Sequence, residues 1–188
     1  VLPLSIGDGE LAETASCVVP LPEVFSYYLQ AGRVDVGFLG AAQIDRHGNL
    51  NSTVIGPYAT PSTRLPGAGG APEIAAHARQ TFVMLKATPR SFVPRVDFRT
   101  SAGFLDGHGS RAHSGARGGG PRAVITDFGI LTPAAGSEEL ELSSLFEGAT
   151  TDSARAAVGW PLIMAPTVRT LAPPTNTELA TLRALQSR

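Results

Sequence analysis

The sequence predicts an α/β protein, a layered domain built around a mainly parallel β-sheet. Short apolar segments of strand length alternate along the chain with helical patterns, which is typical of parallel strands joined by crossover helices. The 188 residues, 43% of them hydrophobic, suffice for one well-filled core and hardly for two. We therefore expect residues 1–188 to form a single domain.

The first third of the chain contains a helical pattern followed by two strand patterns. Residues 22–30 place their apolar side chains on one helical face, and Gly32 supplies a left-handed stop. Residues 34–39 are short, apolar and bounded by glycines, which predicts a buried strand. A turn is expected at 45–49, and a second strand at 51–55.

Further elements follow in the same order of strands and helices. A helix is expected to begin at residue 71, because Pro72 suits a first helical turn and Glu73 favours its positive end. Three more segments have the composition of strands, at 81–85, 123–126 and 140–142.

Two other segments stand out by composition. Residues 103–120 are rich in glycine and poor in apolar side chains, so we expect a mobile surface excursion. Near the end, Thr175 and Glu178 form a capping box, and leucines at three-residue spacing give the following helix an apolar stripe. These leucines are Leu179, Leu182 and Leu185.

Composition excludes several classes of partner. The formal net charge is −1 and no long basic stripe exists, so we expect no nucleic-acid partner. The longest apolar stretches fall far short of the roughly 20 residues that span a bilayer, so we expect no membrane association. The single cysteine, Cys17, excludes an internal disulfide and is interpreted as a buried thiol beside two valines. This cysteine usage fits a reducing compartment, which predicts a cytoplasmic protein.

The strongest chemical signal is the glycine loop, residues 67–70 (Gly-Ala-Gly-Gly), followed by Ala71 at the predicted helix start. Consecutive glycines let the backbone approach a ligand closely, and the amides that open a helix favour negative charge. Such a loop can hold a phosphate, or the oxyanion formed when a carboxylate attacks a thioester. It fits neither a Walker A loop nor a dinucleotide fingerprint. A plain strand-to-helix turn remains the alternative interpretation.

Polar side chains cluster just past the predicted strand 34–39, where ligands bind in parallel α/β sheets. The amides of Gln43 and Asn51 can donate hydrogen bonds to a carbonyl or carboxylate. For Asp45 and Asn49 the interpretation is local turn capping. Arg64, directly before the glycine loop, can meet a phosphate or an acyl carboxylate, or pair with a surface acid.

Metal and serine chemistry find no support. His108 and His113 lie in the glycine-rich segment without a carboxylate or cysteine at ligand spacing, so no metal site is predicted. The serines near the start, Ser5, Ser16 and Ser26, lack a nucleophile-elbow context.

A long set of motifs nevertheless resembles one family. Residues 32–45 (Gly-Arg-Val-Asp-Val-Gly-Phe-Leu-Gly-Ala-Ala-Gln-Ile-Asp) with 48–51, and then 64–71 (Arg-Leu-Pro-Gly-Ala-Gly-Gly-Ala), resemble the second (β) subunit of family I CoA-transferases, of the glutaconate CoA-transferase type. Further similarity is found at 4–8, 23–30, 96–98, 103–107, 124–127 and 172–175, so the resemblance covers nearly the whole chain.

The resemblance implies a CoA-transferase-like fold and a ping-pong reaction with coenzyme A as substrate and no permanently bound cofactor. The implied partners are an α-subunit, an acyl-CoA and a carboxylic acid. The loop residues Gly67, Gly69, Gly70 and Ala71 then correspond to the family's oxyanion and CoA-binding loop. Gln43, Asn51 and Arg64 are expected close to the substrate.

The resemblance also implies that the catalytic nucleophile lies outside this sequence. The family's nucleophilic glutamate is on a strand upstream of the segment that resembles 4–8, so we expect it, and an N-terminal segment, to precede Val1. Glu10 and Glu13 do not match its position. Two alternatives remain open: a CoA-transferase-like hydrolase of a CoA thioester or ring ketone, and a non-catalytic CoA- or ligand-sensing domain. The acyl group and the stoichiometry of the assembly are not predicted.

Overall fold

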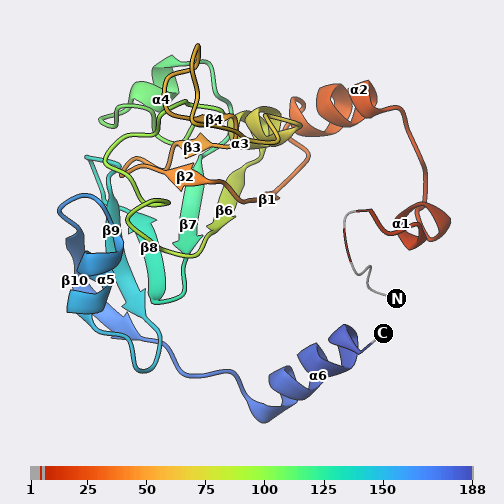
Figure 1. Ribbon diagram of the computed structural model, residues 1–188. Helices are drawn as coiled ribbons and strands as arrows, with labels where there is room; N and C mark the ends of the chain where they lie inside the picture. Colours follow the sequence, from red (N-terminus) through yellow and green to blue (C-terminus); the bar gives the residue numbers. More distant parts are fainter. Residues whose placement is uncertain (1–4, 6, 188) are drawn as a thin grey trace.

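A mixed six-stranded sheet forms the centre of the molecule in the computed structural model, which describes residue 5 and residues 7–187 (Figure 1). Its strands, in spatial order, are β1 (Val36–Leu39), β6 (Gln80–Met84), β7 (Pro121–Ile125), β8 (Gly129–Pro133), β9 (Leu140–Leu145) and β10 (Ile163–Thr170). Only β8 runs against the direction of the other five, because β7–β8 and β8–β9 pair antiparallel while the other neighbours pair parallel. The predicted α/β fold around a mainly parallel sheet is confirmed.

Short hairpins and helices join these strands. The hairpins are β2 (Gln43–Ile44) with β3 (Leu50–Asn51), and β4 (Val54–Ile55) with β5 (Thr63–Arg64). The helices are α1 (Glu10–Glu13), α2 (Leu21–Glu23) continuing into the π-helix η1 (Val24–Leu29), α3 (Ala71–His77), α4 (Ser110–His113), α5 (Thr151–Ala157) and α6 (Asn176–Gln186). The predicted strand 51–55 is thus two strands, divided by a turn at residues 52–53 and belonging to different hairpins.

The core lies on one face of the sheet. Leu39, Val83 and Val124 occupy neighbouring positions on β1, β6 and β7 and point into it. Ile44 and Phe92, both fully buried, belong to the same core. Helix α3 packs on the same face, where Gly37 leaves room for Ile74: a Cβ on Gly37 would lie only 2.4 Å from the Ile74 side chain.

The opposite face is open along β1. Val36 and Phe38 are 37% and 67% exposed, and the Phe38 ring stacks on Phe82 of the neighbouring strand. The prediction that residues 34–39 form a buried strand is therefore wrong for one face. The strand is at the sheet edge, where its side chains alternate between core and surface.

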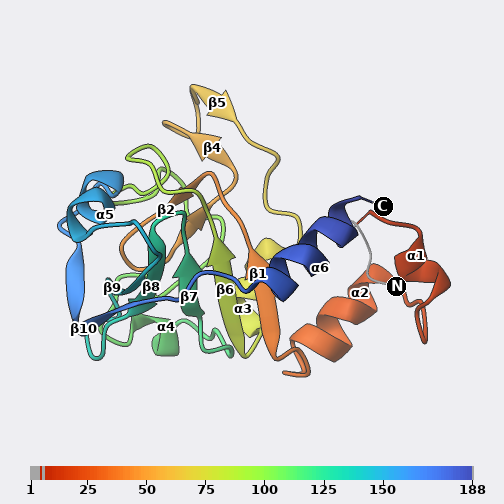
Figure 2. The same ribbon diagram turned by 90° about the horizontal axis from the view of Figure 1, so that it is seen from below.

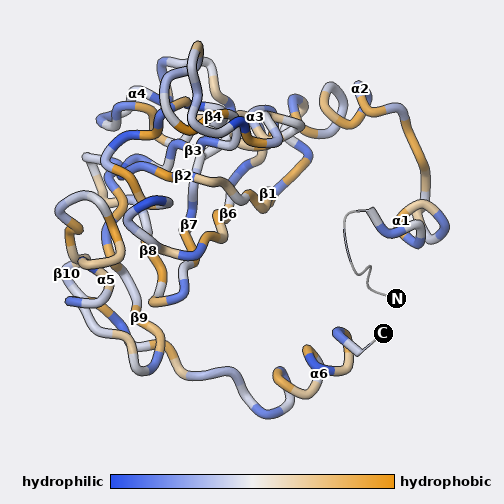
Figure 3. The backbone as a smooth tube through the Cα atoms, viewed as in Figure 1, coloured by the Kyte–Doolittle hydropathy of each residue, from blue (hydrophilic) through white to orange (hydrophobic). Residues whose placement is uncertain are grey.

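Two arms extend from this body (Figures 1 and 2). The N-terminal arm carries α1 and α2, and Cys17 between them is exposed, so the prediction of a buried thiol is wrong. The C-terminal arm carries α6, whose predicted capping box between Thr175 and Glu178 is confirmed. No residue of α6 is buried, although apolar residues recur along it (Figure 3).

The glycine-rich segment 103–120 is packed against the body, which corrects its prediction as a mobile excursion. Its Phe104 and Arg111 are buried, 7% and 4% exposed. The Arg111 guanidinium donates to the carbonyls of Ala75, Gly103 and Gly118 at 2.6, 2.8 and 3.0 Å. The segment has few apolar side chains that could pack on the body. The hydrogen bonds of Arg111 attach it instead, and the bond to the Ala75 carbonyl ties it to the last turn of α3. Burial lowers the pKa of Arg111, and the charge of Glu138 opposes that shift.

Candidate functional site

The glycine loop connects β5 to α3 and uses conformations that favour glycine. Gly67 and Gly69 have φ angles of 102° and 49°, in the left-handed region that side chains rarely adopt. Gly70 has an ordinary φ of −87° and is glycine for a different reason. A Cβ there would lie 2.9 Å from Cζ of Phe25, which η1 holds against the loop.

Three consecutive amides of this loop, those of Ala68, Gly69 and Gly70, are free within the described residues. The Gly67 amide instead donates to the Ser52 carbonyl at 2.8 Å, and the Ala71 amide donates to the Ala68 carbonyl at 3.0 Å. Of the four residues predicted to bind CoA or an oxyanion, Gly69 and Gly70 therefore have donors available for a ligand.

The predicted substrate-proximal amides, Gln43 and Asn51, lie side by side in the β2–β3 hairpin. Asn51 Nδ2 donates to Gln43 Oε1 at 2.7 Å and to the Val54 carbonyl at 2.6 Å. Gln43 Nε2 donates to Asp97 Oδ2 at 3.0 Å. Gln43 is 5% exposed and Asn51 is fully buried. Asn51 supports the turn that follows β3, and Gln43 holds Asn51 and joins the hairpin to Asp97. Contact with a substrate stays a prediction for them.

Arg64 lies on β5 and makes its contacts with Tyr58 at the tip of the same hairpin. Its guanidinium donates to the Tyr58 carbonyl at 3.0 Å and lies 4.8 Å from the ring centroid. The other described partner of the Tyr58 ring is Phe98, stacked at 5.3 Å. In the described part of the chain Arg64 forms no ion pair with an acidic side chain, so its charge is available to an anionic ligand.

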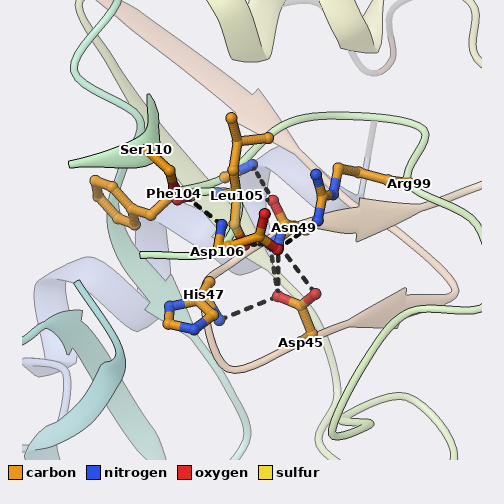
Figure 4. A network of polar contacts seen from close by, with 9 residues as sticks. Asp45, His47, Asn49, Arg99, Phe104, Leu105, Asp106 and Ser110 are labelled. Carbon is orange, nitrogen blue, oxygen red and sulfur yellow. Dashed lines mark hydrogen bonds and ion pairs between the residues drawn. The ribbon is translucent and has the colours of Figure 1, made fainter. Parts of the chain in front are cut away.

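A separate buried network surrounds Asp45 and Asn49 (Figure 4). The Asp45 carboxylate accepts from the backbone amides of His47 and Asn49 at 3.0 and 3.1 Å, and from Asn49 Nδ2. The predicted turn capping is confirmed. Asn49 also reaches beyond the turn: its Oδ1 accepts from the amides of Gly103 and Leu105, and its Nδ2 donates to the Leu105 carbonyl at 2.7 Å. This network anchors the glycine-rich segment, and both groups of the Asn49 side-chain amide are used within it.

Burial raises the pKa of Asp45, and the hydrogen bonds from Asn49 and His47 oppose that shift. The folded protein therefore binds a proton at Asp45 more readily than the unfolded chain does. The contribution of Asp45 to stability is fully present below the ordinary value of 3.8 and decreases as the pH rises through the raised pKa.

Three residues important to the loop were not singled out from the sequence. Ser52 and Thr53 form the turn that holds the loop, and Thr100 is hydrogen-bonded to both of them. Small hydroxyl residues are common in turns, and their partners here lie far away in sequence, so no local pattern could identify them.

Among the described residues, no group of three or more His, Cys, Asp or Glu side chains is arranged to hold a metal ion. No described helix is long and apolar enough to cross a membrane.

The arrangement of these elements places the chain in a known structural class. It superimposes on the crystal structure of glutaconate coenzyme A-transferase from Acidaminococcus fermentans with a TM-score of 0.87 and 31% identity, covering 97% of this chain and 71% of that one. The coenzyme A transferase family model matches residues 5–157. The chain belongs to the coenzyme A transferase family, and its similarity to the second subunit of the glutaconate enzyme confirms the predicted β-subunit resemblance.

Two curated relatives are similar over nearly the whole chain. The β-subunit of 3-oxoadipate CoA-transferase from Pseudomonas knackmussii is 54% identical over all 188 residues, which correspond to 72% of that protein. The β-subunit of glutaconate CoA-transferase from Acidaminococcus fermentans is 34% identical over 92% of this chain and 66% of its own length. The family match includes residues 5–8 of the motif noted at 4–8. Leu4 and Ile6 lie outside the residues that the structure describes.

Proposed function

We propose that this chain is one subunit of an acyl-CoA:carboxylate CoA-transferase that is active together with a partner α-subunit. The supporting observation is the 54% identity, over the full chain, to the β-subunit of 3-oxoadipate CoA-transferase. Coenzyme A is a substrate in this proposal, and no cofactor is bound permanently. The proposal also places the enzyme in the cytoplasm.

The proposed reaction is a ping-pong transfer through a glutamyl-CoA thioester. A glutamate carboxylate attacks the acyl-CoA carbonyl, the CoA thiolate leaves, and an acyl-glutamyl anhydride forms. The thiolate then attacks the glutamyl carbonyl and releases the first carboxylic acid. The acceptor carboxylate repeats both steps in reverse order, which regenerates the glutamate and yields the new acyl-CoA. We propose that this glutamate lies outside residues 1–188.

The proposed role of the glycine loop is to stabilise the oxyanion that forms in each of these attacks. A carboxylate is a weak nucleophile, so the reaction depends on positioning and on donors aimed at the developing negative charge. The free amides of Gly69 and Gly70 are suited to that role. Gly67 and Ala71 frame the loop, because their own amides are used inside the chain.

The proposed acceptor to test first is 3-oxoadipate, with glutaconate second, following the names of the two relatives. Both are dicarboxylates, so one carboxylate reacts while the other needs a cation. Arg64, exposed and beside the glycine loop, is the proposed contact for that second carboxylate. Gln43 and Asn51 remain proposed substrate-proximal residues that act through the turn that Asn51 supports.

The test is a transfer assay on the two-subunit enzyme, with an acyl-CoA donor and each dicarboxylate. We expect a new CoA thioester of the acceptor and no release of free CoA when the acceptor is omitted. Free CoA that accumulates without an acceptor would instead identify the hydrolase alternative. Binding of CoA without turnover under any condition would identify the sensing alternative.

A further inference from the structure

The glycine loop is attached to the body through Ser52. The Gly67 amide donates to the Ser52 carbonyl, and Ser52 Oγ donates back to the Gly67 carbonyl, both at 2.8 Å. The Leu65 amide donates to the neighbouring Thr53 carbonyl at 3.0 Å. Within the described residues, Ser52 is the only residue whose side chain forms a hydrogen bond with residues 65–70.

Ser52 is itself held in place from the other side. Its amide donates to Thr100 Oγ1 at 3.0 Å, and the hydroxyls of Thr100 and Thr53 lie 2.6 Å apart. The buried Asn51 Oδ1 accepts from the Thr53 amide at 3.0 Å and fixes the same turn. The turn is therefore a rigid support, whereas the loop from Gly67 to Gly70 contains three glycines and no side chain larger than a methyl group.

We propose that the Ser52 hydroxyl is a positioning group that fixes the direction of the free Gly69 and Gly70 amides. This inference rests on the function proposed above. The bond from Ser52 Oγ to the Gly67 carbonyl holds the peptide plane between Gly67 and Ala68, whereas the Gly67 amide belongs to the preceding peptide plane. The free Gly69 and Gly70 amides follow in the next two peptide planes. Within the described residues this is the only hydrogen bond of that plane, so without the hydroxyl the plane between Gly67 and Ala68 can rotate about the flexible Gly67.

Loss of the Ser52 hydroxyl should weaken stabilisation of the transition state more than binding of the substrate. Donors of an oxyanion hole must point to where the charge develops, and a displacement of about 1 Å can reduce a rate about 100-fold. Ser52 forms no hydrogen bond with the Gly69 or Gly70 amide itself. Removal of its hydroxyl therefore leaves the loop in place but changes the direction of these two amides. We therefore expect kcat to fall while KM for the acyl-CoA changes little.

The experiment compares Ser52→Ala with Ser62→Ala in the assembled two-subunit enzyme. Ser62 is the matched control, because its hydroxyl also donates to a carbonyl, Ile55 at 3.0 Å, but has no bond to the loop. The expected result for Ser52→Ala is a fall in kcat of about 10- to 100-fold with KM within about twofold. Hydrogen exchange in residues 67–71 should become faster only in Ser52→Ala, at similar melting temperatures of the two variants.

Unchanged kcat in Ser52→Ala would overturn the proposal, and so would a loss that follows a general increase in exchange throughout the chain. If the wild-type enzyme transfers no CoA to any acceptor, the proposed function fails separately. The anchoring of the loop is then decided by exchange alone. Faster exchange limited to 67–71 retains the anchoring, and unchanged exchange there rejects it.

Discussion

At the scale of single residues, the glycine loop depends on a position without a side chain and on a hydroxyl that forms a hydrogen bond with its backbone. Gly70 leaves room for the Phe25 ring, and Ser52 supplies a partner to Gly67. The sequence alone identified the glycines as a possible oxyanion loop. The sequence did not show why each position is glycine. At Gly69 the reason is a positive φ angle, and at Gly70 it is the close contact with Phe25, which lies on a helix distant in sequence.

Replacing Gly70 with valine should reduce kcat at least about 100-fold, as expected for loss of an oxyanion donor. The φ of −87° tolerates a side chain, so the effect is steric: the new Cβ would meet Phe25, and the side chain would occupy the approach to the amide. Steady-state kinetics on the two-subunit enzyme measures this change.

The double variant Gly70→Val with Phe25→Ala separates the two steric causes. If collision with Phe25 alone displaces the loop, the second substitution restores turnover. If the valine blocks the acyl oxygen, turnover stays low. Wild-type turnover in Gly70→Val itself would remove this loop from the mechanism.

Arg111 tests how the glycine-rich segment is held. Arg111→Met should lower the free energy of unfolding by about 3 kcal/mol or more, because it leaves several buried carbonyls without donors. Chemical denaturation measures the change. Arg95→Met is the control, because Arg95 is exposed and has no hydrogen bond or ion pair within the described residues, and we expect about 0.5 kcal/mol or less. Equal effects in the two variants would contradict this account of the segment.

At the scale of elements, the sequence predicted a helix at 22–30, one beginning at residue 71 and one after the capping box at Thr175, and the structure has helices at these places. The central strands were also predicted. Periodicity overlooked β8, β10 and α5, and it merged β3 with β4. The reason is tertiary: β3 and β4 are two-residue strands, and each exists because a different partner strand pairs with it. The burial of Phe104 and Arg111 was likewise invisible locally, since their partners come from α3 and from the turn after β2.

The capping box of α6 gives a pH prediction. Hydrogen bonds from the Thr175 amide and hydroxyl lower the pKa of Glu178 from its ordinary 4.5. A lowered pKa means that the cap is fully formed above 4.5 and is lost as the pH falls through the lower folded value. An NMR titration of the intact chain should show the Thr175 amide and Glu178 carboxyl changing together, with a midpoint below 4.5. Glu178→Gln should abolish the dependence of the Thr175 signal, and a midpoint at or above 4.5 would contradict the cap.

At the scale of the whole molecule, an apolar sheet face and two helical arms are exposed in this chain. One sheet face exposes Val36 and Phe38, and the arms carrying α1 and α6 extend from the body (Figures 1 and 2). The candidate site offers free amides in the glycine loop and the exposed Arg64. The family resemblance predicted the loop, a partner subunit and a catalytic glutamate together, and the site residues stay a prediction. The local physics of the residues predicted the loop, the Gln43 and Asn51 amides and Arg64, but neither the partner subunit nor the nucleophile.

The central claim is that this chain works in CoA transfer through a covalent glutamyl-CoA thioester. The most direct measurement is intact-mass spectrometry of the full-length subunit, copurified with its partner and incubated briefly with an acyl-CoA. We expect the subunit's mass to increase by that of coenzyme A less one water, and 3-oxoadipate or another free carboxylic acid to discharge the adduct. A protein that binds CoA tightly but never forms the adduct, with any acyl-CoA, would contradict the account.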